Sequence, residues 1–223
     1  MAERWATFDC YGTLIDWLNG IRGAVRHVWP SADVERLLRR HQAIEPLVQE
    51  GRSLDYREVG ARTLRAIAAI EGLSLRSADD YALADSLPTW PAFPEVRPAL
   101  AQLKAQGWRL AILSNTDPDL LDASVKHIGV DVDVRITAAE AGSYKPAHSH
   151  WRRFFEVSGA DPRRHVHVAA SLVHDIAPAQ ELGLTAVWIN RLGESTTLPR
   201  AAELRDLSPL PHTLDRLVRQ PGD

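Results

Sequence analysis

Strand-like and helix-like segments alternate along the second half of this sequence. Short segments typical of strands lie at residues 108–113, 134–136, 165–169 and 184–189. Segments with helical periodicity precede or separate them, at residues 94–106, 117–127, 149–158 and 175–182. Such alternation predicts a parallel sheet, because each helix crosses over one face of the sheet to reach the start of the next strand. We therefore expect a doubly wound α/β core with helices on both faces.

An apolar run, at residues 5–8, ends in a carboxylate at Asp9 and is followed by a turn at Gly12. Ligands of open parallel sheets bind beyond the carboxyl ends of the strands, and a carboxylate at such a place can act as a nucleophile. An ordinary Asx-type turn explains the same residues. Polar groups also follow three later strands, and this agreement favours a functional site. These groups are Ser114, Asn115, Lys145 and the loop 170–175.

Residues 17–92 differ in character from the rest of the chain. Helical periodicity follows Asp33 and Asp55, no strand-like alternation occurs, and the proline-rich segment 87–91 ends the block. We expect two domains: an α/β core of residues 1–16 and 93–223, and an all-helical cap of residues 17–92. The tail from residue 196 is expected to pack on the core and to carry no chemistry.

Composition excludes several classes of function. The 223 residues have a net charge of -3, so no basic surface favours nucleic acid. No segment approaches the roughly 18 apolar residues that a membrane span requires, and no signal-peptide pattern is seen. Cys10 is the single cysteine, so no internal disulfide can form. We expect a soluble, cytoplasmic protein that acts on a small molecule.

Four segments, in chain order, resemble the four sequence motifs of the haloacid dehalogenase superfamily. They are Asp9-Cys10-Tyr11-Gly12-Thr13, Leu113-Ser114-Asn115, Ser143-Tyr144-Lys145-Pro146 and Ala169-Ala170-Ser171-Leu172-Val173-His174-Asp175. The resemblance covers nearly the whole chain, and it implies the α/β core and inserted cap of that superfamily. Tyr11 points to the branch of (S)-2-haloacid dehalogenases.

Two carboxylates that superfamily phosphatases carry are missing here. Tyr11 stands where they have their second aspartate, and Ala170 stands where they have an acidic metal ligand. Magnesium prefers several oxygen ligands in an octahedral array, and phosphoryl transfer depends on such a cation. A magnesium-dependent phosphatase is therefore the weaker interpretation. A relative that has diverged to another substrate is a further alternative.

The resemblance to the dehalogenases implies a metal-independent and cofactor-free reaction. Asp9 would displace the halide from a short 2-haloalkanoic acid and form an ester, which water would then hydrolyse. Lys145 would hold Asp9 ionised, because a nearby cation should lower the pKa of a carboxylate. Thr13 would hydrogen-bond the nucleophile loop, and Asp175 would stabilise Lys145 or activate the hydrolytic water.

The same resemblance implies a set of substrate- and halide-binding residues. They are Tyr11, Arg40, Ser114, Asn115, Trp151 and Ser171. Ser114 and Asn115 would act as donors to the substrate carboxylate. Arg40, with Arg39 as the alternative, would supply the cationic halide ligand from the cap, although paired arginines usually lie on a solvated helix face.

Other residues depart from the family pattern or allow a simpler interpretation. Ala170 and Leu172 replace polar residues of the fourth motif, and Trp151 replaces a tyrosine. His165 and His167 share one face of a strand, without ligands that would make a metal site. We expect these histidines to be structural, whereas His174, next to Asp175, is a candidate proton carrier. A homodimer is common among such relatives.

Overall fold

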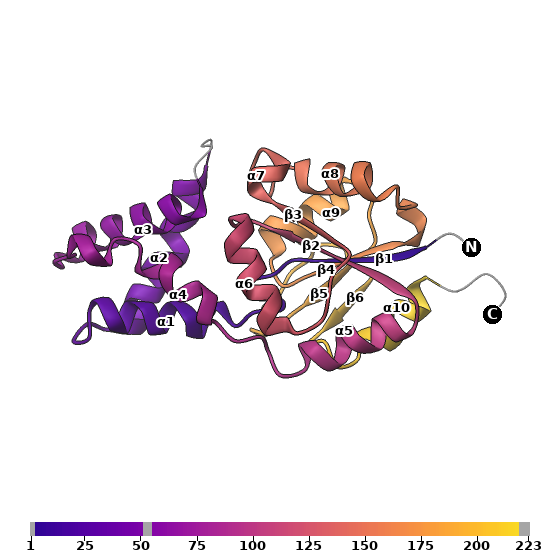
Figure 1. The fold of residues 1–223 in the computed structure, drawn as a ribbon, viewed down its shortest axis with the longest axis horizontal. Helices are drawn as coiled ribbons and strands as arrows, with labels where there is room; N and C mark the ends of the chain where they lie inside the picture. Colours follow the sequence, from indigo (N-terminus) through magenta and orange to yellow (C-terminus); the bar gives the residue numbers. More distant parts are fainter. Residues whose placement is uncertain (1–2, 51–54, 219–223) are drawn as a thin grey trace.

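The computed structural model describes residues 3–50 and 55–218 and contains one parallel sheet (Figure 1). Its six strands lie in the order β3-β2-β1-β4-β5-β6. Their bounds are β1 (Arg4–Phe8), β2 (Trp108–Ser114), β3 (Val134–Thr137), β4 (His165–Ala169), β5 (Ala186–Ile189) and β6 (Ala202–Leu204). The prediction of a doubly wound α/β core is confirmed. The strand β6 was missed, since no strand was expected in the tail from residue 196.

Helices cover both faces of this sheet. They are α5 (Val96–Ala105), α6 (Pro118–Ile128), α7 (Ala138–Ala141), α8 (Ser149–Ser158), α9 (Ala177–Glu181) and α10 (Leu210–Leu217). Alternate residues of a strand point to opposite faces, and the core is divided accordingly. Phe8 packs in one cluster with residues of α5, α6 and α10, whereas Trp5 packs in another with Phe154 of α8. The central strand β1 is therefore buried on both sides.

The segment between β1 and α5 contains helices only, as far as its described residues extend. These are α1 (Trp17–Val28), α2 (Val34–Gln49), α3 (Tyr56–Glu71), η1 (Ser77–Asp79), α4 (Ala82–Ser86) and η2 (Leu87–Thr89). Asp33 caps α2 by accepting from the amide of Arg36, and Asp55 caps α3 by accepting from the amide of Glu58. Such aspartate caps satisfy amides that have no partner inside the helix. We call the part of this segment from α1 to η2 the cap.

Two antiparallel linkers join the cap to the core. The amide of Asp16 donates to the oxygen of Pro91 at 2.9 Å, and the amide of Phe93 donates to the oxygen of Leu14 at 3.0 Å. Figure 1 shows the cap as a separate layer beside the sheet. No helix in the described ranges is both long and apolar enough to span a membrane.

A second contact between cap and core lies at the start of α3. The carboxylate of Asp117, which precedes α6 in the core, accepts the amides of Tyr56 at 2.8 Å and Arg57 at 3.2 Å. The Arg57 guanidinium also reaches Asp119 on α6. The cap is thus held to the core at the N-terminus of α3 as well as at the linkers.

Candidate active site

The site lies at the carboxyl end of the sheet, where β1 runs between β2 and β4. Phe8 pairs with Ile112 on one side and with Val168 on the other. Asp9, directly after β1, donates its amide to the oxygen of Val168 at 3.1 Å. Because neighbouring parallel strands end at the same edge, residues far apart in the sequence converge there.

The turn after Asp9 requires a glycine. Gly12 has a φ of 94°, a region that side chains with a Cβ rarely adopt. A Cβ at this position would also lie 2.8 Å from Nε1 of Trp17 in the cap. The turn returns the chain so that the hydroxyl of Thr13 donates to Oδ2 of Asp9 at 2.9 Å. The same hydroxyl accepts the amide of Ala170 at 2.9 Å, which ties the turn to the loop after β4.

Lys145 joins the two aspartates of the site. Its Nζ lies 2.8 Å from Oδ1 of Asp9, 2.6 Å from Oδ1 of Asp175 and 2.9 Å from the oxygen of Leu113. The Lys145 side chain is 1% exposed, so its ammonium is compensated by these groups and hardly by water. All three donor directions of the ammonium are thereby used.

The pKa values of these three groups move in different directions. Burial raises the pKa of Asp9, with Lys145 opposing this effect. Burial acts in the same sense on Asp175, but there Lys145 and His167 together prevail and hold its pKa well below the usual range. Burial disfavours the Lys145 ammonium, yet Asp175 and Asp9 raise the pKa of Lys145 overall. Lys145 does lower the pKa of Asp9, but burial and the charge of Asp175 outweigh this effect, so that the net shift is upward.

Asp175 lies in a short π-helical segment, η4 (Leu172–Ile176), that follows β4. Its Oδ1 receives both Lys145 and Nε2 of His167, the latter at 3.1 Å. Its Oδ2 is buried and has no hydrogen-bond partner among the described residues. Asp175 therefore offers one unused acceptor oxygen, and the residue lies in the wall of a cavity.

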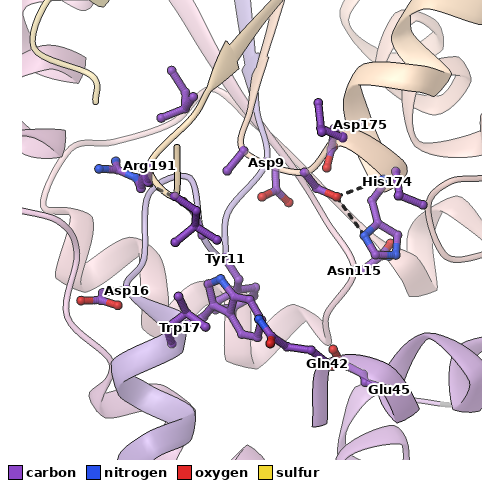
Figure 2. Close-up of a pocket in the computed structure, with 18 of the residues that line it drawn as sticks. Asp9, Tyr11, Asp16, Trp17, Gln42, Glu45, Asn115, His174, Asp175 and Arg191 are labelled. Carbon is purple, nitrogen blue, oxygen red and sulfur yellow. Dashed lines mark hydrogen bonds between the residues drawn. The ribbon is translucent and has the colours of Figure 1, made fainter. Parts of the chain in front are cut away.

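This cavity, of about 930 Å³, opens between the core and the cap (Figure 2). The core contributes Asp9, Tyr11, Asn115, Lys145, Ser171, His174 and Asp175. The cap contributes Trp17, Gln42, Glu45 and Tyr56. Figure 2 shows the carboxylate of Asp9 directed towards the space between these groups. A small molecule in this space meets the nucleophile candidate on one side and the cap on the other.

Three of the predicted binding residues line the cavity. Tyr11 shares a hydrogen bond of 3.0 Å with Ser124, and burial raises its pKa, so the phenol stays protonated. Asn115 clasps the backbone of Lys145: its Oδ1 accepts the Lys145 amide at 2.7 Å and its Nδ2 donates to the Lys145 oxygen at 3.0 Å. Ser171 accepts the amide of His174 at 3.0 Å. Asn115 thus positions the backbone of the loop that carries Lys145.

Arg40 does not lie in the cavity, contrary to the prediction. Its guanidinium pairs with Glu71 on α3 at 2.6 Å and remains 46% exposed. Gln42 and Glu45 of the same helix line the cavity. At 3.6 residues per turn, Arg40 lies about 200° around the helix from Gln42. Arg39, the alternative, is also exposed and does not line the cavity.

Ser114 and Trp151 are likewise absent from the cavity wall. Ser114 is fully buried, and its Oγ has no partner among the described residues. It immediately precedes Asn115, and successive residues of an extended strand point to opposite sides. Trp151 is a fully buried residue of α8, with its ring 5.2 Å from that of His167. Both residues belong to the packing below the site.

Arg191 extends the site beyond the predicted residues, and His174, the candidate proton carrier, also lies there. Arg191 follows β5 and donates to the oxygen of Thr13 at 2.8 Å, to that of Gly12 at 3.2 Å and to Glu95 at 2.6 Å. It thereby fixes the turn that carries Asp9. The only sequence signal for Arg191 was its place just after an expected strand. His174 lines the cavity, with Nδ1 3.1 Å from Oγ of Ser171.

The phosphatase alternative would require a magnesium ion, and the side chains at the site are poorly suited to hold one. Asp9 and Asp175 are both engaged by the Lys145 ammonium. Ala170 brings no ligand side chain. In the described part of the chain, no three His, Cys, Asp or Glu side chains are placed to hold a metal ion together. These residues do not fit a divalent cation.

Comparisons with known proteins agree with this geometry. The family model of the haloacid dehalogenase-like hydrolases matches residues 4–183. The (S)-2-haloacid dehalogenase of Pseudomonas sp. (strain YL) is 29% identical over 192 residues, covering 83% of this chain and 82% of the relative. Haloacetate dehalogenase H-2 of Moraxella sp. (strain B) is 30% identical over 198 residues, covering 83% and 85%. The crystal structure of the L-2-haloacid dehalogenase RSc1362 superimposes with a TM-score of 0.84 at 26% identity, covering 96% of this chain and 100% of that one.

Proposed function

This chain belongs to the haloacid dehalogenase-like hydrolase family, and we propose that it hydrolytically removes the halide from short 2-haloalkanoic acids. The names of its relatives support this reaction class. The observation that carries the proposal is the placement of Asp9 at the cavity, held by Lys145 on one oxygen and by Thr13 on the other. A carboxylate fixed in this way has little freedom to lose when it attacks a bound substrate.

In the first step, an oxygen of Asp9 attacks the carbon that carries the halogen. A C–O bond forms, the carbon–halogen bond breaks, and the halide leaves with the bonding electron pair. The product is an ester between Asp9 and the acid. Dividing one difficult displacement into two easier steps is the usual gain of covalent catalysis.

In the second step, water attacks the carbonyl carbon of the Asp9 ester. Asp175 supplies the base: its Oδ2 is unpartnered, whereas its Oδ1 is occupied by Lys145 and His167. The water proton passes to Asp175, the ester bond breaks, and a 2-hydroxy acid and the Asp9 carboxylate are released. Configuration inverts once, at the attack on carbon.

The proposed reaction uses no metal ion, because the Lys145 ammonium supplies positive charge between Asp9 and Asp175. A halide leaves as a stable monoanion, so the step lacks the accumulation of charge that makes phosphoryl transfer dependent on a cation. The protonated Tyr11 phenol and the Asn115 amide provide polar groups in the cavity wall.

The test is halide release from (S)-2-chloropropionate in excess chelator, with Asp9→Asn as the matched variant. Release that survives chelation and is lost in Asp9→Asn supports the proposal. A single turnover in ¹⁸O-labelled water should also place the label in Asp9. Magnesium-dependent cleavage of an aryl phosphate without halide release would overturn the proposal in favour of a phosphatase. Inactivity in both assays would favour a relative with another substrate.

A further inference from the structure

Behind Asp175, the buried side chains of His167, Thr7 and His165 form a hydrogen-bonded row. None of the three makes or breaks a bond in the proposed reaction. Nε2 of His167 lies 3.1 Å from Oδ1 of Asp175. Nδ1 of His167 lies 2.8 Å from Oγ of Thr7, which in turn lies 2.8 Å from Nε2 of His165. All four residues have 0% exposure. Thr7 and His167 are register partners on β1 and β4, so the row crosses from one central strand to the other.

The hydrogen atoms of this row can be assigned from its ends. Burial lowers the pKa of His165 to about 3, so its ring is neutral and carries one hydrogen. Nδ1 of His165 has no partner among the described residues. A hydrogen on Nδ1 would have no acceptor among the described residues, whereas a hydrogen on Nε2 can be donated to Thr7. We assign it to Nε2.

The remaining hydrogens follow from that assignment. Thr7 accepts from His165 and has a single hydroxyl hydrogen, which it donates to Nδ1 of His167. His167 then carries its hydrogen on Nε2 and donates it to Asp175. The pKa of Asp175 is held low, so its carboxylate is ionised and can only accept, which independently places a hydrogen on Nε2 of His167. The row thus selects one tautomer of His167.

Titratable groups of three described elements interact with His167. They are His165 of β4, His150 of α8 and Asp175 of η4. Burial, with the Lys145 ammonium, lowers the pKa of His150 to about 3, so that ring is neutral. Nε2 of His150 is engaged by the oxygen of Ser114 at 3.2 Å. The edge-on ring of Trp151 closes the remaining side.

We propose that His167 is a positioning residue that directs the free oxygen of Asp175 towards the hydrolytic water. Its Nε2–H fills one acceptor site of Oδ1 while Lys145 fills another, so the carboxylate cannot rotate without losing two hydrogen bonds. Thr7 and His165 do not contact Asp175; they contribute by fixing the tautomer of His167. The consequence for water rests on the proposed function; the hydrogen-bonded row does not.

The kinetic test compares His167→Gln with His167→Met, two side chains of similar size of which only Gln can donate to Asp175. We expect His167→Met to slow hydrolysis of the Asp9 ester by about 10- to 100-fold, the range for outer hydrogen-bond partners that orient a catalytic ligand. The first equivalent of halide should still be released, so the ester accumulates and is seen by mass spectrometry. His167→Gln should restore hydrolysis. Equal rates in both variants, at equal unfolding free energies, would overturn the proposal.

A second measurement does not depend on the substrate. In ¹⁵N-histidine-labelled protein, the His167 ring should show a hydrogen on Nε2, and Asp175→Asn should shift that signal while leaving His150 unchanged. A hydrogen on Nδ1 of His167 would overturn the proposal even if the enzyme is a dehalogenase. If the wild-type protein releases no halide but shows the Nε2 hydrogen, the proposed function fails and the row stands.

Discussion

The ammonium of Lys145 lies closest to Asp175, with 2.6 Å between Nζ and Oδ1. Its distance to Oδ1 of Asp9 is 2.8 Å. Asp175 also accepts a hydrogen bond from His167. Among the described residues, the partner of Oδ2 of Asp9 is the neutral hydroxyl of Thr13. One cation thus serves two buried carboxylates, and the nucleophile candidate is the less compensated of the two.

We expect the rate of halide release to fall on acidification. The midpoint of this fall should lie above pH 3.9, the value about which an unperturbed aspartate titrates. Asp9 must be ionised to attack, and its pKa is raised, so it binds a proton at a higher pH than usual. Activity should therefore rise with pH through this raised pKa. The measurement is kcat/KM against pH, with circular dichroism at each pH as a control for unfolding. An acid limb below the ordinary aspartate value, in folded protein, would contradict the assignment.

Replacing Asp175, the carboxylate that competes for Lys145, should shift the acid limb of the pH–rate profile. Asp175 raises the pKa of Asp9 through its charge. In Asp175→Asn, we expect the pH midpoint for release of the first halide equivalent to shift downwards, although turnover stops at the ester. Rapid-quench measurement of the first equivalent in both proteins tests this. An unchanged or higher midpoint would show that the two carboxylates do not interact.

Lys145→Met should destabilise the protein and abolish turnover. It leaves Asp9 and Asp175 buried without their cation, and removing one partner of a buried ion pair costs about 3–5 kcal/mol. Urea unfolding monitored by circular dichroism gives the free energy. Lys104→Met is the matched control, because Lys104 is more exposed and donates to the oxygen of Asp131 at the surface. Equal losses in the two variants would argue against a central role for Lys145.

Thr13→Val should lower the rate of the first step more than Thr13→Ser. Valine keeps the shape but removes the donor to Asp9 and the acceptor for the Ala170 amide. An unpaired buried group costs about 1–3 kcal/mol, so a loss of about 5- to 150-fold in kcat is expected. Serine retains both bonds and should recover most of the rate. The measurement is the rate of single-turnover halide release in the two variants, and equal rates would contradict the prediction.

Arg191→Met should lower kcat/KM, whereas Arg40→Met should leave it nearly unchanged. Arg191 holds the backbone oxygens of Gly12 and Thr13, and hydrogen bonds from a charged group contribute about 1.5–3 kcal/mol each. We expect at least about a tenfold loss of kcat/KM for Arg191→Met. Arg40 pairs with Glu71 away from the cavity, so Arg40→Met should leave kcat/KM nearly unchanged. The reverse order would restore Arg40 as a halide ligand.

Most strands of the core were predictable because they are buried on both faces and rich in apolar residues. The missed strand β6 contains Ala202, Glu203 and Leu204, which pair with β5 alone at the edge of the sheet. An edge strand of three partly exposed residues has no apolar pattern to distinguish it from a loop.

The site was predictable where the backbone alone decides the placement. Asp9, Lys145 and Asp175 follow directly from the topology of strand ends. Arg40 and Ser114 depended on which side of an element a residue faces, and a shift of one or two positions reverses that side. The role of His167 depends on a threonine 160 residues earlier in the chain, and no local pattern reports such a pairing.

The paired linkers at residues 14–16 and 91–93 mean that the insertion leaves and re-enters the core at a single stem. Asp9, Lys145 and Asp175 all lie outside the inserted segment, whereas Trp17, Gln42, Glu45 and Tyr56 lie within it. The proposed nucleophile, its lysine and the proposed base are therefore encoded in one part of the gene, and the cap side of the cavity wall in another. Exchanging the segment on this stem is a route to new substrate ranges with the same reaction chemistry.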